Sequence, residues 1–270
     1  MDKTSGAERV RRAIEKANQE GRAALVPYLC AWDPDLESTR ALLWALAEAG
    51  ASVVELGFPF SDPLADGPTI QAATQRALRH RPDLSAYLEF VADLYREGYP
   101  LPIVIMGYYN PFYRYGLERF VEEARAAGLC GAIIPDLPLE EARAWLKESR
   151  KRGLAGIMLA APTTPPERLR RIAEASTGFL YYVSVAGITG VRDRLPEDLV
   201  LRLDLAREVS PVPVAVGFGI AKPEQVRMLA PHAEAIVVGS ALVRIVEAEG
   251  RKAPERVGRF VRELVSAAER

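Results

Sequence analysis

The chain has 270 residues, 49% of them hydrophobic, and a formal net charge of −1. This charge gives no electrostatic reason to expect a nucleic acid or an anionic membrane as partner, and no apolar run approaches the length of a membrane span. The N-terminus does not resemble a signal peptide. We expect Cys30 and Cys130 to be buried thiols in a reducing cytoplasm, and two histidines are too few to suggest a zinc or other metal site.

The predicted elements alternate between strands and helices along the whole chain. A helical segment, Glu8–Ala17, comes first. Eight continuously apolar runs follow, as expected for parallel strands buried on both faces. They are Ala24–Cys30, Ser52–Leu56, Pro102–Met106, Gly131–Pro135, Leu154–Leu159, Phe179–Val183, Val212–Val216 and Ala235–Val238. Eight strand–helix units predict a single (β/α)₈ barrel domain over residues 1–270, closed at the bottom by the extra N-terminal helix. An open doubly wound α/β sheet is the alternative.

The second predicted strand ends in a carboxylate, Glu55, and the loop after it carries Asp62 and Asp66. A charge at the end of a buried strand is costly unless it is paired or used. In a parallel barrel the carboxyl ends of the strands are where ligands bind, so Glu55 is a candidate acid or base. The alternative is that these acids cap turns and the next helix, and we prefer it for Asp62, which precedes a proline.

Three glycine clusters follow the sixth, seventh and eighth predicted strands: Gly187–Gly190, Gly217–Ile220 and Gly239-Ser240. One explanation is structural: the glycines only make tight turns. Barrels, however, often bind phosphate with the loops after the last strands, where bare N–H groups and a helix N-terminus face the anion. The spacing predicts a phosphate monoester and not a dinucleotide, because Lys222 stands where a third glycine would be needed.

Aromatic side chains near the barrel mouth are candidates for the walls of a pocket. Tyr181 and Tyr182 are adjacent in one strand, so one should face the barrel interior and the other the helices. Tyr108 and Tyr109 follow the third predicted strand. Simple packing would also explain them. The sequence offers no Cys–His or Ser–His arrangement for nucleophilic catalysis, which leaves proton transfer by carboxylates.

The residues from Glu55 to Gln71, with the sequence ELGFPFSDPLADGPTIQ, resemble the tryptophan synthase alpha chain family nearly residue for residue. Shorter similarities follow in the same order at Pro135–Pro138, Tyr181–Gly190, Gly217–Gly219 and Val238–Ser240. One position departs from the family pattern. The first strand–helix turn has Trp32 where the family usually has glycine, and this side chain would either cover the pocket or pack on the surface.

The resemblance implies a phosphate-binding TIM barrel that acts as a lyase in tryptophan biosynthesis. It would cleave indole-3-glycerol phosphate to indole and D-glyceraldehyde 3-phosphate by a retro-aldol reaction. Glu55 would be the general acid/base and Asp66 the second essential carboxylate. The remaining substrate contacts would be Tyr28, Tyr108, Tyr181, Thr189 and Phe218, and the phosphate contacts Gly190, Gly219, Gly239 and Ser240.

The same resemblance implies a partner and leaves two competing functions. The partner would be a pyridoxal-phosphate-dependent beta chain that receives the indole in a cytoplasmic α₂β₂ heterotetramer, and this chain would need no cofactor of its own. One competing function is a barrel isomerase for another sugar phosphate. The other is a regulatory subunit without activity. Glu55 and Asp66, both present, argue against an inert subunit.

The expected chemistry assigns different protonation states to the two carboxylates. Protonation of indole C3 makes the indole a leaving group, so Glu55 needs a raised pKa. Asp66 should be ionised, with an ordinary pKa, to accept the indole N–H and stabilise the positive ring.

Overall fold

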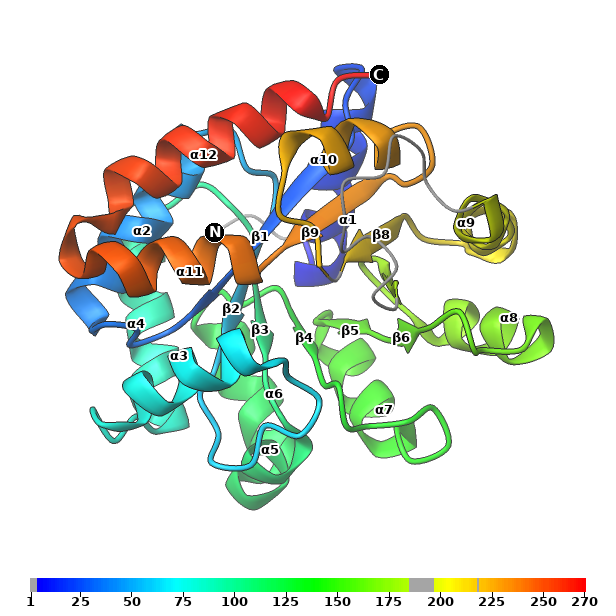
Figure 1. Cartoon of the computed structure of the whole chain (residues 1–270). Helices are drawn as coiled ribbons and strands as arrows, with labels where there is room; N and C mark the ends of the chain where they lie inside the picture. Colours follow the sequence, from blue (N-terminus) through cyan, green and yellow to red (C-terminus); the bar gives the residue numbers. More distant parts are fainter. Residues whose placement is uncertain (1–3, 185–196, 218) are drawn as a thin grey trace.

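The structure, a computed structural model, describes residues 4–184, 197–217 and 219–270. Its strands form one parallel sheet in the order β5-β4-β3-β2-β1-β9-β8-β7-β6. The two outermost strands, β5 (Ala155–Ile157) and β6 (Leu159–Ala160), are separated only by Met158. The sheet therefore closes on itself as a barrel with helices packed around it (Figure 1), and the open-sheet alternative is wrong.

The remaining strands agree closely with the apolar runs of the sequence. They are β1 (Ala24–Cys30), β2 (Val54–Gly57), β3 (Ile103–Met106), β4 (Gly131–Ile133), β7 (Leu180–Val183), β8 (Val214–Gly217) and β9 (Ala235–Val238). The difference lies in the fifth predicted strand, Leu154–Leu159. It is split because its first half hydrogen-bonds to β4 and its second half to β7.

Helices follow most strands and cover the outside of the barrel. Those described are α1 (Gly6–Gln19), α2 (Leu36–Glu48), α3 (Pro68–Leu78), α4 (Leu84–Arg96), α5 (Tyr109–Tyr115), α6 (Leu117–Ala126), α7 (Arg143–Arg152), α8 (Pro166–Ala175), α9 (Glu197–Val209), α10 (Pro223–Leu229), α11 (Ser240–Glu249) and α12 (Ala253–Ala267), with a 3₁₀ turn η1 (Gly250–Lys252). Local sequence sets their ends. Asp35 caps α2 through the Ser38 N–H, and Gly153 ends α7 in the left-handed conformation.

Helix α1 closes the bottom of the barrel, as its position in the sequence predicted. Its buried residues Val10, Ile14 and Ala17 follow helical spacing and pack against the inward-facing side chains of the strands. The Ala7 N–H donates to the Gly153 carbonyl, just before β5 begins. The lower barrel is therefore filled with side chains, and open space is left only toward the carboxyl ends of the strands.

Alternation along the strands decides which side chains reach the barrel interior. In β7, Tyr181 packs against the interior cluster, whereas Tyr182 belongs to the cluster between sheet and helices. In β2, Val54 and Leu56 face the helices. Glu55 between them therefore points inward, at the upper end of the barrel.

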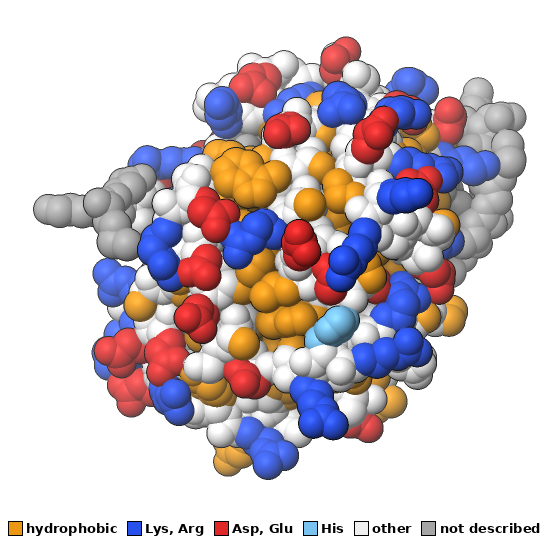
Figure 2. All heavy atoms as spheres, turned by 90° about the vertical axis from the view of Figure 1, so that its left-hand side faces the viewer, with side chains coloured by type: hydrophobic (Ala, Val, Ile, Leu, Met, Phe, Trp, Pro, Cys, Tyr) orange, Lys and Arg blue, Asp and Glu red, His pale blue; other side chains and the backbone are white. Residues whose placement is uncertain are grey.

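The face that carries α2, α11 and α12 has no strong charge bias. Figure 2 shows acidic and basic side chains interspersed over it, with small apolar patches between them. Within the described residues, no helix is both long and apolar enough to cross a membrane.

Candidate active site

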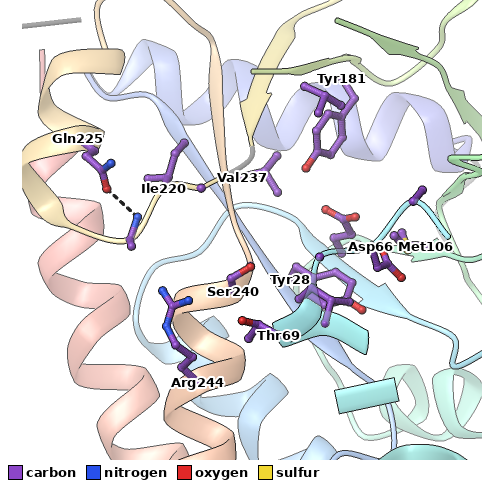
Figure 3. Close-up of a pocket in the computed structure, with 18 of the residues that line it drawn as sticks. Tyr28, Asp66, Thr69, Met106, Tyr181, Ile220, Gln225, Val237, Ser240 and Arg244 are labelled. Atoms are coloured by element: carbon purple, nitrogen blue, oxygen red, sulfur yellow. Dashed lines mark hydrogen bonds between the residues drawn. The ribbon is translucent and has the colours of Figure 1, made fainter. Parts of the chain in front are cut away.

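A cavity of about 1160 Å³ opens at the carboxyl ends of the strands. Figure 3 shows Tyr28, Asp66 and Tyr181 at one end of it, and Ser240 and Arg244 at the other. The first turns of α3, α10 and α11 form much of the second end. The cavity therefore has an acid end, near Glu55 and Asp66, and what we call the glycine end, near Gly219 and Gly239.

Glu55 is buried at the acid end, with only 3% of its surface exposed. Its Oε2 atom has no hydrogen-bond partner among the described residues. Burial, together with the nearby Asp66 carboxylate, raises the pKa of Glu55 to about 8. An acid of this kind is mostly protonated at neutral pH, so it can donate a proton to a bound molecule.

Asp66 lies at the same end, on the loop between β2 and α3. The Tyr108 hydroxyl accepts a hydrogen bond from the Ala65 N–H at 2.9 Å and donates to the Asp66 carboxylate. Burial raises the pKa of Asp66 to about 6, although the bond from Tyr108 opposes this shift. The ordinary pKa that the sequence analysis predicts for Asp66 is therefore wrong. The order is kept, because Asp66 still ionises well before Glu55.

The loop that carries Asp66 is also held by its own backbone. The Asp66 N–H donates to the Pro63 carbonyl, and the Gln71 side-chain amide donates to the Asp66 carbonyl at 2.8 Å. Asp62 is exposed and its carbonyl accepts the Leu64 N–H, as the turn interpretation predicted. Position 66 is thus fixed from both sides, whereas Asp62 is not among the residues that line the cavity.

Two tyrosines line the acid end because glycines opposite them leave room. A Cβ atom on Gly57 would come within 2.4 Å of the Tyr28 hydroxyl, and one on Gly217 within 2.6 Å of the Tyr181 hydroxyl. Burial and the Glu55 and Asp66 carboxylates raise the pKa of both phenols. Tyr28 and Tyr181 therefore stay neutral and present an aromatic wall, which suits a flat apolar ligand.

Tyr108 does not belong to the described residues that line the cavity. Only 3% of its surface is exposed, and it contacts the site through Ala65 and Asp66. The structure thus gives Tyr108 a supporting position rather than a direct contact with the open space.

Two glycines and a serine belong to the glycine end. Gly219, Gly239 and Ser240 line it. Gly239 is the N-cap of α11 and Gly67 the N-cap of α3, and neither cap has a side-chain hydrogen bond. The first N–H groups of α11 therefore stand at the cavity wall without a side-chain acceptor, which favours an anion there, whereas α3 begins with Pro68, which has no N–H.

Thr189, Gly190 and Phe218 were also predicted as contacts, and they lie outside the described residues. The remaining substrate and phosphate contacts from the sequence, Tyr108 apart, all line one cavity.

Sequence reasoning missed several residues at the glycine end. Thr69 on α3, Arg244 on α11 and the side chains of Lys222 and Arg227 near α10 also line the cavity. A signal was present for Arg244, which stands four residues after Ser240 and so on the same helix face. For the others, the sequence alone does not show which loops meet.

Trp32 neither covers the cavity nor packs on the surface, contrary to both expectations. It is 6% exposed, and its ring lies 6.2 Å from that of Tyr87. Its φ is +63°, a conformation in which glycine is free of strain and tryptophan is not. Burial of the indole against Tyr87, and a bond from the Trp32 N–H to Thr39 Oγ1, hold the turn.

Within residues 4–184, 197–217 and 219–270, no group of three or more His, Cys, Asp or Glu side chains is arranged to hold a metal ion. Cys30 and Cys130 are free and buried, as predicted.

A model of the family described as tryptophan synthase alpha chain matches residues 14–269. The chain belongs to the tryptophan synthase alpha chain family. A tryptophan synthase alpha chain from Chloroflexus aggregans is 47% identical over 266 residues, which cover 97% of this chain and 98% of that protein. The resemblance seen at Glu55–Gln71 is thus confirmed over nearly the full length.

Solved structures of the tryptophan synthase alpha chain family have the same barrel. The crystal structure of the alpha subunit from Legionella pneumophila is 37% identical, with a TM-score of 0.88 over 96% of this chain and 98% of that one. A chain in the tryptophan synthase complex from Pyrococcus furiosus is 42% identical, with a TM-score of 0.82 over 91% of this chain and 99% of that one.

Proposed function

We propose that this chain, as one barrel domain over residues 1–270, is the alpha subunit of a tryptophan synthase. Its reaction is the retro-aldol cleavage of indole-3-glycerol phosphate to indole and D-glyceraldehyde 3-phosphate. Family membership supports this lyase activity and argues against an isomerase for another sugar phosphate. The arrangement of the cavity, with two carboxylates at one end and bare backbone N–H groups at the other, suits a substrate that is aromatic at one end and a phosphate at the other.

Glu55 acts as the general acid on indole C3. Its buried carboxyl has a pKa of about 8 and is mostly protonated at neutral pH. Protonation of C3 makes the ring a neutral leaving group when the C–C bond breaks. The glycerol hydroxyl next to that bond loses a proton as the aldehyde forms, and the Glu55 carboxylate left by the first transfer is the base that takes it.

Asp66 stabilises the positive charge that C3 protonation places on the indole ring. With a pKa of about 6, it is mostly ionised at neutral pH and accepts a hydrogen bond from the indole N–H. The Tyr108 hydroxyl favours this ionised form. The tyrosine wall of Tyr28 and Tyr181 holds the ring between the two carboxylates.

The observation that carries the proposal is the raised pKa of the buried Glu55 beside the more acidic Asp66 in one cavity. Environments that separate the pKa values of two carboxylates also separate their roles. A subunit with only a regulatory role would have no need to bury an unpaired carboxyl at the cavity wall.

We propose that indole passes to a pyridoxal-phosphate-dependent beta chain in a cytoplasmic α₂β₂ heterotetramer, and that this chain needs no cofactor or metal of its own. The solved complex from Pyrococcus furiosus supports such a partner. We further propose that Thr189 steadies Asp66, that Gly190 binds the substrate phosphate and that Phe218 contacts the substrate.

Release of free indole tests the proposal. The purified chain is mixed with indole-3-glycerol phosphate, and indole is measured with and without a tryptophan synthase beta chain. Indole should form slowly with the chain alone and faster with the partner. Absence of indole in both cases would contradict the lyase activity. Indole that forms only after the beta chain is added would support the regulatory alternative.

A further inference from the structure

Arg244 is a cationic side chain at the glycine end that the proposed chemistry does not yet use. It lies one helical turn after Ser240 on α11 and lines the same cavity. Side chains on a helix lean toward its N-terminus, and Figure 3 shows the guanidinium near Ser240 and Thr69. Helix α11 therefore brings a positive charge to the place where its own first N–H groups face the cavity.

No residue that the structure describes forms an ion pair or a hydrogen bond with Arg244, although acids are at hand on its own helix. Glu247, three residues on, pairs instead with Arg76 at 2.8 Å. An arginine and an acid three residues apart do pair elsewhere on a helix of this chain, as Arg96 does with Asp93. The Arg244 guanidinium thus remains available to a ligand.

The charges around the cavity are separated along its length. Glu55 and Asp66 stand at the acid end, whereas Lys222, Arg227 and Arg244 stand at the glycine end together with one acid, Glu224. A phosphate dianion is attracted to the second end and repelled from the first. This separation also fixes which way round a substrate with one phosphate enters.

We propose that Arg244 is a further substrate-binding residue. Its guanidinium donates to oxygens of the substrate phosphate, while the N–H groups of Gly239 and Ser240 bind the phosphate from the helix end. A guanidinium fork matches two phosphate oxygens, and a charged donor strengthens each bond. The identity of the ligand as a phosphate ester rests on the proposed function.

Binding of substrate fragments tests the proposal without turnover. Glycerol 3-phosphate and inorganic phosphate are titrated calorimetrically into the wild type, Arg244→Lys and Arg244→Gln. The glutamine variant should bind both about tenfold more weakly, the usual size for a lost charged hydrogen bond. The lysine variant should be intermediate, and affinity for indole, which has no phosphate, should not change.

Two arginines serve as controls with the same change in charge. Arg262 is exposed on α12 and does not line the cavity, so Arg262→Gln should bind both fragments like the wild type. Arg227 lines the cavity but stands on α10. If Arg227→Gln loses as much affinity as Arg244→Gln, the loss comes from the overall positive potential of the cavity, and a specific contact between Arg244 and the phosphate is refuted.

Steady-state kinetics with indole-3-glycerol phosphate then separates binding from chemistry. Arg244→Gln should raise KM, keep kcat close to the wild-type value, and weaken the dependence of kcat/KM on salt. Unchanged fragment binding beside normal indole release would overturn the role of Arg244 alone. Fragment binding that depends on Arg244 without any indole release would leave that role standing and overturn the proposed function.

Discussion

The two ends of the cavity differ in how they treat charge: the acid end disfavours ionised groups, whereas the glycine end keeps a fixed positive charge. At the acid end, burial removes water from Glu55 and Asp66 and makes both harder to ionise. At the glycine end, exposed cations and helix N–H groups around Gly239 keep a permanent positive potential. Proton transfer needs a group that changes charge near neutral pH, whereas phosphate binding needs charges that do not change. One cavity supplies both because its ends differ in burial.

Glu55→Gln should cause the largest loss and confine it to the acid end. An amide cannot donate a proton to C3, and loss of a general acid usually lowers turnover by about 10²- to 10⁴-fold. The affinity for glycerol 3-phosphate should be unchanged, because the glycine end is untouched. The measurement is kcat from indole release, together with calorimetry of the fragment.

The matched control for this change is Glu224→Gln, which makes the same substitution at the other end of the same cavity. It should keep turnover close to that of the wild type. If Glu55→Gln retains more than about a tenth of the activity, Glu55 is not the general acid.

Gly219→Val should cause the reverse pattern. Gly219 has φ +77°, and a β-branched residue in that conformation is strained by about 1–3 kcal/mol. The loop should move its N–H groups, and affinity for glycerol 3-phosphate should fall about tenfold or more. Turnover at saturating substrate should fall less.

Gly239→Ala offers a milder comparison at the same end. Its φ lies at −118°, and an added Cβ would stand 3.4 Å from the Tyr28 side chain. We expect a smaller loss of fragment affinity than with Gly219→Val. Equal affinity in the wild type and Gly219→Val would place the phosphate elsewhere.

The pH profile should report Glu55 on its alkaline limb, and on its acid limb both Asp66 and the second ionisation of the substrate phosphate, whose pKa is also about 6. Activity needs Asp66 ionised and Glu55 protonated, so kcat/KM should rise with pH through about 6 and fall as pH passes about 8. Tyr108→Phe removes a hydrogen bond that favours ionised Asp66, so its acid limb should move to higher pH. Binding of glycerol 3-phosphate should rise as its phosphate becomes a dianion at about pH 6 but should not fall again at about pH 8. A flat kcat/KM between pH 5 and 9 would contradict the assignment.

Much of the fold followed from local pattern. Strands buried on both faces read as apolar runs, so β1 and β9 coincide with Ala24–Cys30 and Ala235–Val238. The division of Leu154–Leu159 did not follow, because it depends on which neighbour each half pairs with. Pairing across the closure of a barrel is a long-range property that no short window contains.

The candidate site shows the same limit. Glu55 stands out in the sequence because charge at the end of a buried strand needs a reason, whereas Asp66 is identified through the resemblance of Glu55–Gln71 to the family. The raised pKa of Asp66 and the contact of Tyr108 with Ala65 could not be predicted from the sequence. That contact joins residues 43 positions apart. Trp32 misled for a similar reason, because the positive φ that its glycine-like position demands is offset by burial against Tyr87.

The unpartnered Oε2 of Glu55 makes heat resistance depend on pH. In the unfolded chain this carboxyl ionises near its ordinary pKa of 4.5, but in the folded chain only near 8. Its contribution to folding stability is therefore intact below pH 4.5 and is lost progressively as the pH rises to about 8. Across that range the melting temperature of the wild type should fall relative to that of Glu55→Gln. If the melting temperatures of the two proteins change with pH in the same way, the pKa of Glu55 is not raised in the folded chain. The chain thus works over the pH range in which its own acid weakens the fold, and a bound substrate, by stabilising only the folded state, would restore what is lost.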